Sequence, residues 1–213
     1  LESPPHGRRI RPFLLDTHEV TVGEFKVIMK RLPMNLWENV PPDDHAVCEV
    51  SYDEAVHYAE LVGKRLPTEA EYEFAATGGG QLQFPWGDSA ELMTEWSFGP
   101  VGEPRFDKLL HDPPVFGLYS NVAEWTSSWG RLYPNQLDQQ PATASEDRIV
   151  RGAPVRLVNG QPDRAQWSSG PRARVMLARQ ITSVGLGFRC ARSTKPRRYQ
   201  NDFTTLVVPS PGR

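Results

Sequence analysis

The sequence predicts an α+β protein that is rich in loops, with short helices and small antiparallel sheets. Its 213 residues include 20 prolines and 17 glycines, which interrupt regular elements too often for a helical bundle. Three helix-start signals, each a Ser or Thr followed three positions later by Glu, precede short stretches of apolar periodicity. A chain of this length is able to bury one sizeable core, or two small ones.

The first predicted elements are a strand and a helix. Residues 12–19 read PFLLDTHE and predict the strand. The capping box Thr21-x-x-Glu24 predicts a helix start at Thr21, with an apolar face of Phe25, Ile28 and Met29. Residues 32–44 are rich in proline and acidic residues and predict a loop.

Two further helices follow, each opened by its own capping box. Ser51 with Glu54 predicts the second helix, and Gly63 stands where its C-terminal cap belongs. Thr68 with Glu71 predicts the third. On the second helix, we expect four apolar residues to face inwards: Ala55, Tyr58, Ala59 and Val62. Later in the chain, residues 148–152 (RIVRG) and 187–192 (GFRCAR) predict strands.

Composition and charge are those of an ordinary globular protein, with 38% hydrophobic and 23% charged residues. A formal net charge of -2 gives no reason to expect a nucleic acid or an anionic membrane surface as partner. We find neither an apolar run that would span a bilayer nor the apolar stretch of a signal peptide, and the sequence does not identify a compartment.

The two cysteines, Cys48 and Cys190, have no spacing typical of a redox or metal site. They form either one disulfide or two buried thiols, and we favour the thiols because free cysteine packs as a small hydrophobe. The five histidines are scattered, so we do not expect a structural metal held by His or Cys.

Residues 63–73, GKRLPTEAEYE, closely resemble the GKRLPTEAEWE signature of the formylglycine-generating enzyme family, also called the sulfatase-modifying factor domain. Similar matches lie at FPWGD (84–88), FGLY (116–119), RIVRG (148–152) and GFRCAR (187–192), in the family's order. The resemblance implies a fold related to C-type lectins and one domain over residues 12–192, with residues 1–11 as a tail or linker and residues 193–213 as a C-terminal extension.

The resemblance also implies where chemistry should lie. The family oxidises a cysteine in sulfatases with two cysteine thiolates that suit Cu(I) and follow the RGG strand. No cysteine lies between Cys48 and Cys190, so we expect no catalytic residues and no copper. The alternative is an oxidoreductase with a non-standard site, for which Cys48 is the thiol to consider, because it precedes a helix start.

Family members often bind calcium in the turn that this chain carries as Ser120 to Trp125, through backbone carbonyls and the Glu carboxylate. The resemblance therefore implies Asn121, Val122 and Glu124 as a calcium site, although the turn is shorter here. The alternative is that Glu124 pairs with an arginine or caps backbone amides.

We expect a non-catalytic binding or sensory module whose partner is a protein or a small molecule, without nucleic acid and without direct membrane insertion. Similar domains are appended to bacterial Ser/Thr kinases, and others are the variable ligand-binding proteins of diversity-generating retroelements. Aromatic residues and arginine dominate binding hot spots. The predicted ligand residues are Arg164, Trp167, Arg172, Arg174 and Met176. The alternative places Trp167 and Met176 in the core and the arginines on a solvated surface.

Overall fold

The structure is a computed structural model, and it describes residues 9–33, 40–89, 98–103, 107–130, 146–152, 157–158, 161–162 and 171–194. The helices are α1 (Val22–Met29), α2 (Tyr52–Leu61) and α3 (Glu69–Ala76). The strands are β1 (Phe13–Leu15), β2 (Lys108–Leu109), β3 (Val115–Phe116), β4 (Ala123–Trp129), β5 (Arg148–Gly152), β6 (Leu157–Val158), β7 (Gln161–Pro162), β8 (Val175–Leu177), β9 (Leu186–Gly187) and β10 (Ala191–Ser193).

All three predicted capping boxes are present. At the start of α1, the Thr21 N–H donates to Glu24 Oε2 at 2.9 Å and the Glu24 N–H donates to Thr21 Oγ1 at 3.1 Å. Ser51 and Thr68 open α2 and α3 with the same reciprocal bonds. These bonds satisfy amides that have no partner within the helix. Because each bond joins residues three positions apart, the sequence pattern predicts the helix starts.

The main sheet has four strands in the order β8-β5-β4-β9. β4 runs antiparallel to β5, and β5 antiparallel to β8. β9 lies parallel to β4, with Ala123 opposite Leu186. The predicted small antiparallel sheets are present, and β9 adds one parallel pair, because the connection after β8 carries the chain to the far edge of the sheet, where it runs in the direction of β4.

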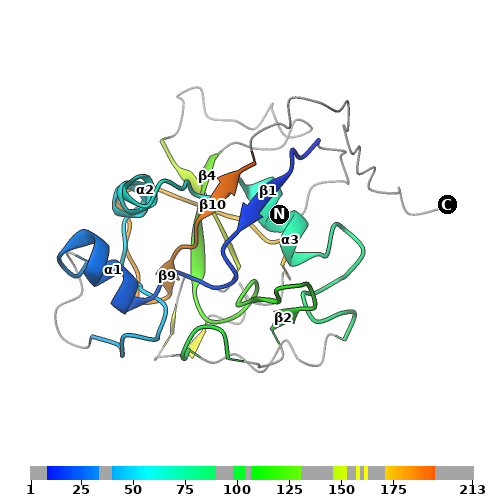
Figure 1. Ribbon diagram of the computed structural model, residues 1–213, viewed down its shortest axis with the longest axis horizontal. Coiled ribbons are helices and arrows are strands. Elements are labelled where there is room, and N and C mark those ends of the chain that lie inside the picture. Colours follow the sequence, from blue (N-terminus) through cyan, green and yellow to red (C-terminus); the bar gives the residue numbers. More distant parts are fainter. Residues whose placement is uncertain are drawn as a thin grey trace.

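β1 and β10 form a two-stranded antiparallel sheet that joins the two ends of the described chain (Figure 1). The strand predicted over residues 12–19 is shorter than expected and ends at Leu15. Residues 16–20 continue beside residues 188–190 through isolated bonds, from the Asp16 N–H to the Cys190 carbonyl and from the Val20 N–H to the Phe188 carbonyl, both at 2.9 Å.

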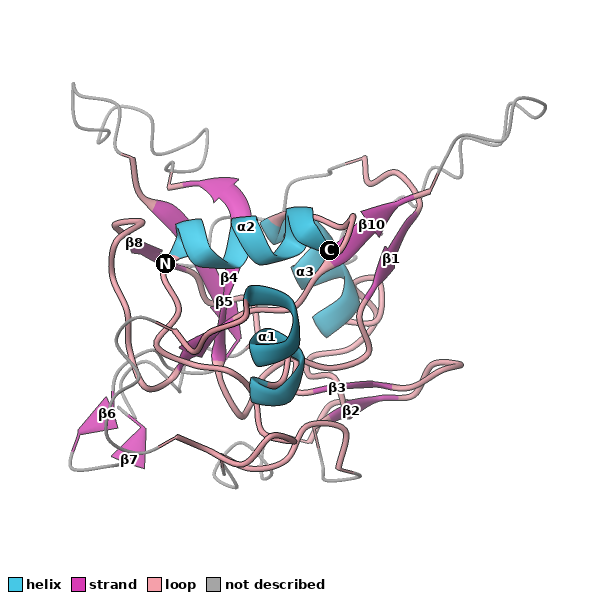
Figure 2. Ribbon diagram, turned by 60° about the vertical axis from the view of Figure 1, so that its left-hand side comes forward, coloured by secondary structure: helices cyan, strands magenta, loops and turns pink. Residues whose placement is uncertain are grey.

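The main core lies between the helices α1 and α2 and the strands β4 and β5 (Figure 2). The Phe25 ring of α1 stacks on Tyr58 of α2 at 5.8 Å, and Phe188 meets the Tyr58 ring edge-on at 5.3 Å. Trp125 is fully buried and donates its indole N–H to the Val50 carbonyl at 2.8 Å. Each such aromatic ring contributes about 2–3 kcal/mol by leaving water. Within the described residues, no helix combines the length and apolar character needed to cross a membrane.

Candidate functional site

Glu124 and Arg189 form the centre of a buried ionic network beneath the turn that precedes β4. The Arg189 Nε–H donates to Glu124 Oε2 at 2.8 Å, and its Nη2–H donates to Oε1 at 2.8 Å. The Tyr72 hydroxyl donates to Glu124 Oε1 at 3.0 Å. Arg189 also donates to the carbonyls of Phe116 and Gly117, both at 2.8 Å. The network thus ties β4, α3 and the chain's closing segment to the loop before the turn.

The network contains three buried carboxyl groups, Glu19, Asp107 and Glu124, around the single buried guanidinium of Arg189. Burial raises the pKa of Glu19 from 4.5 to about 8, although Arg189, with its Nη2 at 3.8 Å, lowers it. Burial likewise raises the pKa of Glu124 and of Asp107. A proton held on Glu19 near neutral pH reduces the excess of buried negative charge.

Calcium was expected at Asn121, Val122 and Glu124. In the structure, both oxygens of Glu124 accept bonds from Arg189, which is the alternative considered for this residue. The Asn121 amide donates to Glu19 Oε1 at 3.1 Å and accepts from the Gly99 N–H at 3.1 Å. Val122 is buried in a small apolar cluster. A cation at Glu124 would have to displace a guanidinium, and calcium binding remains a prediction.

The two cysteines are free thiols and both are buried. They lie in different clusters, Cys48 with Ala46 and Val122, and Cys190 in the main core. The pKa of each thiol is raised to about 12, by burial at both residues and, at Cys48, also by the charge of the neighbouring Glu49. Neither thiol is therefore ionised near neutral pH, and neither is placed to act with the other.

The predicted ligand residues are only partly within the described structure. Arg164 and Trp167 lie outside the described residues. Arg172 is exposed, and Met176 on β8 is 39% exposed. Arg174 is almost fully buried, and its guanidinium pairs with Glu69 at 2.9 Å. Of the three described residues, Arg172 and Met176 are the ones whose side chains reach the surface.

Two other arginines near these residues, Arg151 and Arg179, are held by carboxylates. Arg151 is buried and donates to Glu73 Oε2 at 2.7 Å, and Arg179 pairs with Asp53 on the surface. Arg151 also donates to the Arg172 carbonyl at 2.6 Å, and this hydrogen bond holds the segment before β8 against β5. These arginines thus mainly brace β5 and β8.

Sequence reasoning missed Asp107. Its Oδ2 accepts from the N–H groups of Tyr119 and Ser120 at 2.8 and 2.6 Å, and from the Ser120 hydroxyl at 2.7 Å, so it holds the turn before β4. No local pattern marks this residue, because its partners are twelve or more positions away in the chain.

The sequence matches the sulfatase-modifying factor enzyme 1-like domain over residues 1–194. Formylglycine-generating enzyme of Mus musculus is 31% identical over 173 residues, covering 72% of this chain and 45% of that protein. Inactive C-alpha-formylglycine-generating enzyme 2 of Bos taurus is 36% identical over 166 residues, 68% of this chain and 49% of that protein. The chain thus spans about half the length of these curated relatives.

Two other similarities concern a shorter segment and the fold. Serine/threonine-protein kinase pkn1 of Chlamydia pneumoniae is 39% identical over 89 residues, 40% of this chain and 14% of the kinase. Treponema denticola variable protein 1 superposes with a TM-score of 0.64 at 18% identity, covering 85% of this chain and 84% of that structure. The latter shows the expected C-type lectin-like fold of the formylglycine-generating enzyme type. The chain therefore belongs to the formylglycine-generating enzyme, or sulfatase-modifying factor, family, as a member without the family's catalytic cysteine pair.

Proposed function

We propose that this chain is a non-catalytic member of its family that acts as a binding module for a protein or a small molecule. The observation that supports this proposal best is the burial of both cysteine thiols in separate places. Cys48 and Cys190 are its only cysteines, and both are buried in separate apolar clusters. A copper site of two thiolates needs two ionised sulfurs at one accessible place, and these two residues do not provide it.

The alternative, an oxidoreductase built on Cys48, is less well supported. Its position before α2 favours a thiolate only where the sulfur is exposed to the helix N-terminus and to solvent. Burial among apolar side chains and the charge of Glu49 both raise the pKa of this thiol, to about 12. A nucleophile would need the opposite shift.

The binding role is supported by exposed side chains on a rigid frame. Met176 lies opposite Ile149 in the β5–β8 pairing, and the Arg174–Glu69 and Arg151–Glu73 pairs hold that edge of the sheet. Loops carried by such a frame are common recognition sites. We assign ligand contact to Arg164, Trp167, Arg172 and Met176, and a positioning role to Arg174.

A sensory role within a larger protein is the finer part of the proposal. The partial similarity to a Ser/Thr kinase supports a domain of this kind attached to a kinase. Similarity to a variable protein supports a fold that tolerates diversified surface residues.

The non-catalytic part is tested with the reduced chain, Cu(I), oxygen and a peptide that carries the cysteine of a sulfatase. Aldehyde formation is followed by hydrazide labelling, with the mouse formylglycine-generating enzyme as positive control. We expect no aldehyde from this chain. Aldehyde formation that persists after Cys48→Ser would point to a site without this thiol, and aldehyde formation that is lost would revive the Cys48 alternative.

The binding face is tested with peptides selected from a random displayed library on the immobilised chain. Peptides that use the proposed face should bind Met176→Ser and Trp167→Ala at least about tenfold more weakly, since hot-spot truncations cost more than about 1.4 kcal/mol. Asp53→Asn, which alters an exposed carboxylate of the Arg179 pair, serves as the control. Selected peptides that bind all variants equally would refute this assignment of the face.

A further inference from the structure

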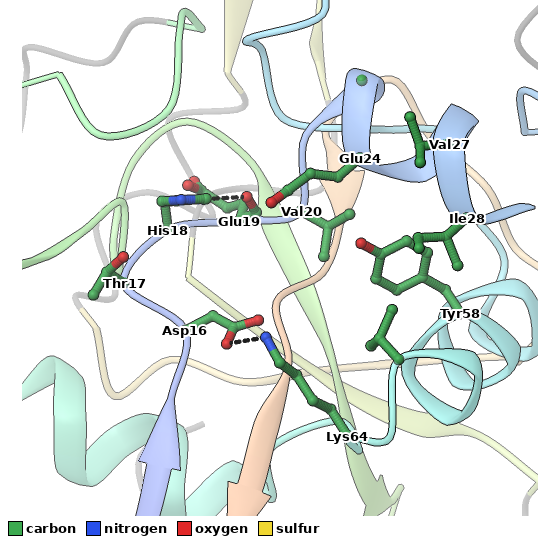
Figure 3. Close-up of a pocket in the computed structure, with 12 residues that line it drawn as sticks. Asp16, Thr17, His18, Glu19, Val20, Glu24, Val27, Ile28, Tyr58 and Lys64 are labelled. Atoms are coloured by element: carbon green, nitrogen blue, oxygen red, sulfur yellow. Dashed lines mark hydrogen bonds and ion pairs between the residues drawn. The ribbon is translucent and has the colours of Figure 1, made fainter.

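A pocket of about 500 Å³ lies between residues 16–20, α1 and the C-terminal end of α2 (Figure 3). Its apolar wall consists of Val20, Val27, Ile28, Val62 and the ring of Tyr58. The volume is within the range of small-ligand sites. None of the predicted ligand residues lines this pocket, so it is a separate site.

Tyr58 is a buried residue whose hydroxyl points into this pocket (Figure 3). The residue is 5% exposed, and its ring is fixed by the stacked contact with Phe25. Among the described residues, none forms a hydrogen bond with this hydroxyl or pairs a cation with Glu24. Glu24 Oε2 accepts the capping bond from Thr21 at 2.9 Å, while its carboxylate faces the same space (Figure 3).

The charges of the pocket are unbalanced. Lys64 Nζ lies 2.6 Å from Asp16 Oδ1, so these two charges neutralise each other and Glu24 remains without a counterion among the described residues. Glu19 also lines the pocket, but its carboxyl is turned into the buried network. Burial raises the pKa of Tyr58, and the charge of Glu24 raises it further, as expected in a site of negative potential.

We propose that this pocket binds the lysine side chain of another polypeptide. An ammonium group has three donors, and the pocket offers acceptors from Glu24, from the Tyr58 hydroxyl and from Asp16, whose Oδ1 already accepts from Lys64. The planar fork of arginine is matched best by both oxygens of one carboxylate, and Glu24 Oε2 already accepts the capping bond from Thr21. The four-carbon stem of lysine fits the apolar wall.

Exposed apolar side chains beside the pocket favour a polypeptide over a free amine. Val27 on α1 is 63% exposed and Leu61 on α2 is 54% exposed. Residues that flank the bound lysine would cover both, as neighbouring apolar contacts do around an interface anchor. The inference names a ligand class for the binding function proposed above, and rests on that function only in treating the chain as a binding module.

Isotope-labelled chain titrated with an acetylated, amidated Leu-Lys-Leu peptide tests the proposal, with NMR amide shifts as the readout. Leu-norleucine-Leu is the matched peptide without the ammonium group, and n-butylamine represents the free amine. We expect a Kd of about 1 mM for the lysine peptide, and shifts over residues 16–24 and 58–64. The norleucine peptide should bind about tenfold more weakly because it cannot form the charged hydrogen bonds. n-Butylamine should also bind about tenfold more weakly because it lacks the flanking apolar contacts.

Glu24→Gln provides the variant test, because glutamine also closes a capping box and leaves the helix start intact. It should weaken the lysine peptide about tenfold and leave the norleucine peptide unchanged. Glu60→Gln removes a carboxylate from an exposed position of α2 outside the pocket and should change neither.

Equal affinity for the lysine and norleucine peptides would overturn the proposal that this pocket binds a lysine side chain. Amide shifts confined to residues outside 16–24 and 58–64 would overturn it too. n-Butylamine binding as tightly as the lysine peptide would overturn the polypeptide as its source. Aldehyde formation in the copper assay would refute the non-catalytic function without affecting these results, so the two failures are distinguishable.

Discussion

Replacing Glu124 by glutamine tests how strongly the buried pair of this carboxylate with Arg189 stabilises the fold. In the folded chain, Glu124 accepts three contacts from Arg189 at 2.8 to 3.0 Å and one from Tyr72 at 3.0 Å. An amide nitrogen in place of one oxygen would face the guanidinium donors. The other acidic group that contacts Arg189 is Glu19, 3.8 Å from its Nη2, and burial raises the pKa of Glu19 to about 8.

Breaking one partner of a buried ion pair costs about 3–5 kcal/mol, a large part of the roughly 5–15 kcal/mol that stabilises a domain. Urea denaturation at neutral pH measures this loss as a decrease in the free energy of unfolding. Asp53→Asn, which breaks the exposed pair with Arg179, is the control and should cost no more than about 1 kcal/mol.

A loss below about 1 kcal/mol for Glu124→Gln would refute the reasoning, since a buried unpaired guanidinium is costlier than that. A second measurement tests calcium binding. Chelation with EDTA should leave the free energy of unfolding of the unaltered chain unchanged, because Arg189 already occupies both oxygens of Glu124. A marked decrease on chelation would show that a bound cation stabilises the fold.

Three further predictions follow from buried groups. Cys48 and Cys190, with pKa values raised to about 12 by burial, should react with iodoacetamide only after unfolding in urea, and rapid reaction in the folded chain would contradict their burial. Because the pKa of Glu19 rises from 4.5 to about 8 on folding, its contribution to stability is complete below the unfolded value and is lost as the pH rises towards 8. Glu19→Gln should flatten this decrease between about pH 5 and about pH 8, and an unchanged slope would exclude Glu19 as its source. Gly117→Ala would place a methyl group 2.3 Å from Glu19 Oε1 and should cost more than about 2 kcal/mol, whereas Gly63→Ala, at a similar positive φ but with open space around it, should cost only about 1 kcal/mol in urea denaturation.

The helix starts and one strand could be predicted from the sequence because the interactions that form them are local. Thr21, Ser51 and Thr68 each bond to a glutamate three positions later, so a short pattern contains the whole interaction. The strand predicted at residues 148–152 is β5, with the same limits. The family signature added the fold and, through the missing cysteines, the absence of the family's thiolate pair.

Tertiary structure alone decided what the charged residues do. The sequence did not show that Arg189 would lie against Glu124, or that α3 would place Glu69 beside Arg174. The acidic pocket likewise joins Glu24, which the sequence showed only as a helix cap, to Tyr58, which it showed only as core. Capping and periodicity act within a few residues, whereas the partner of a buried charge depends on which distant segments pack together, and no local pattern records that choice.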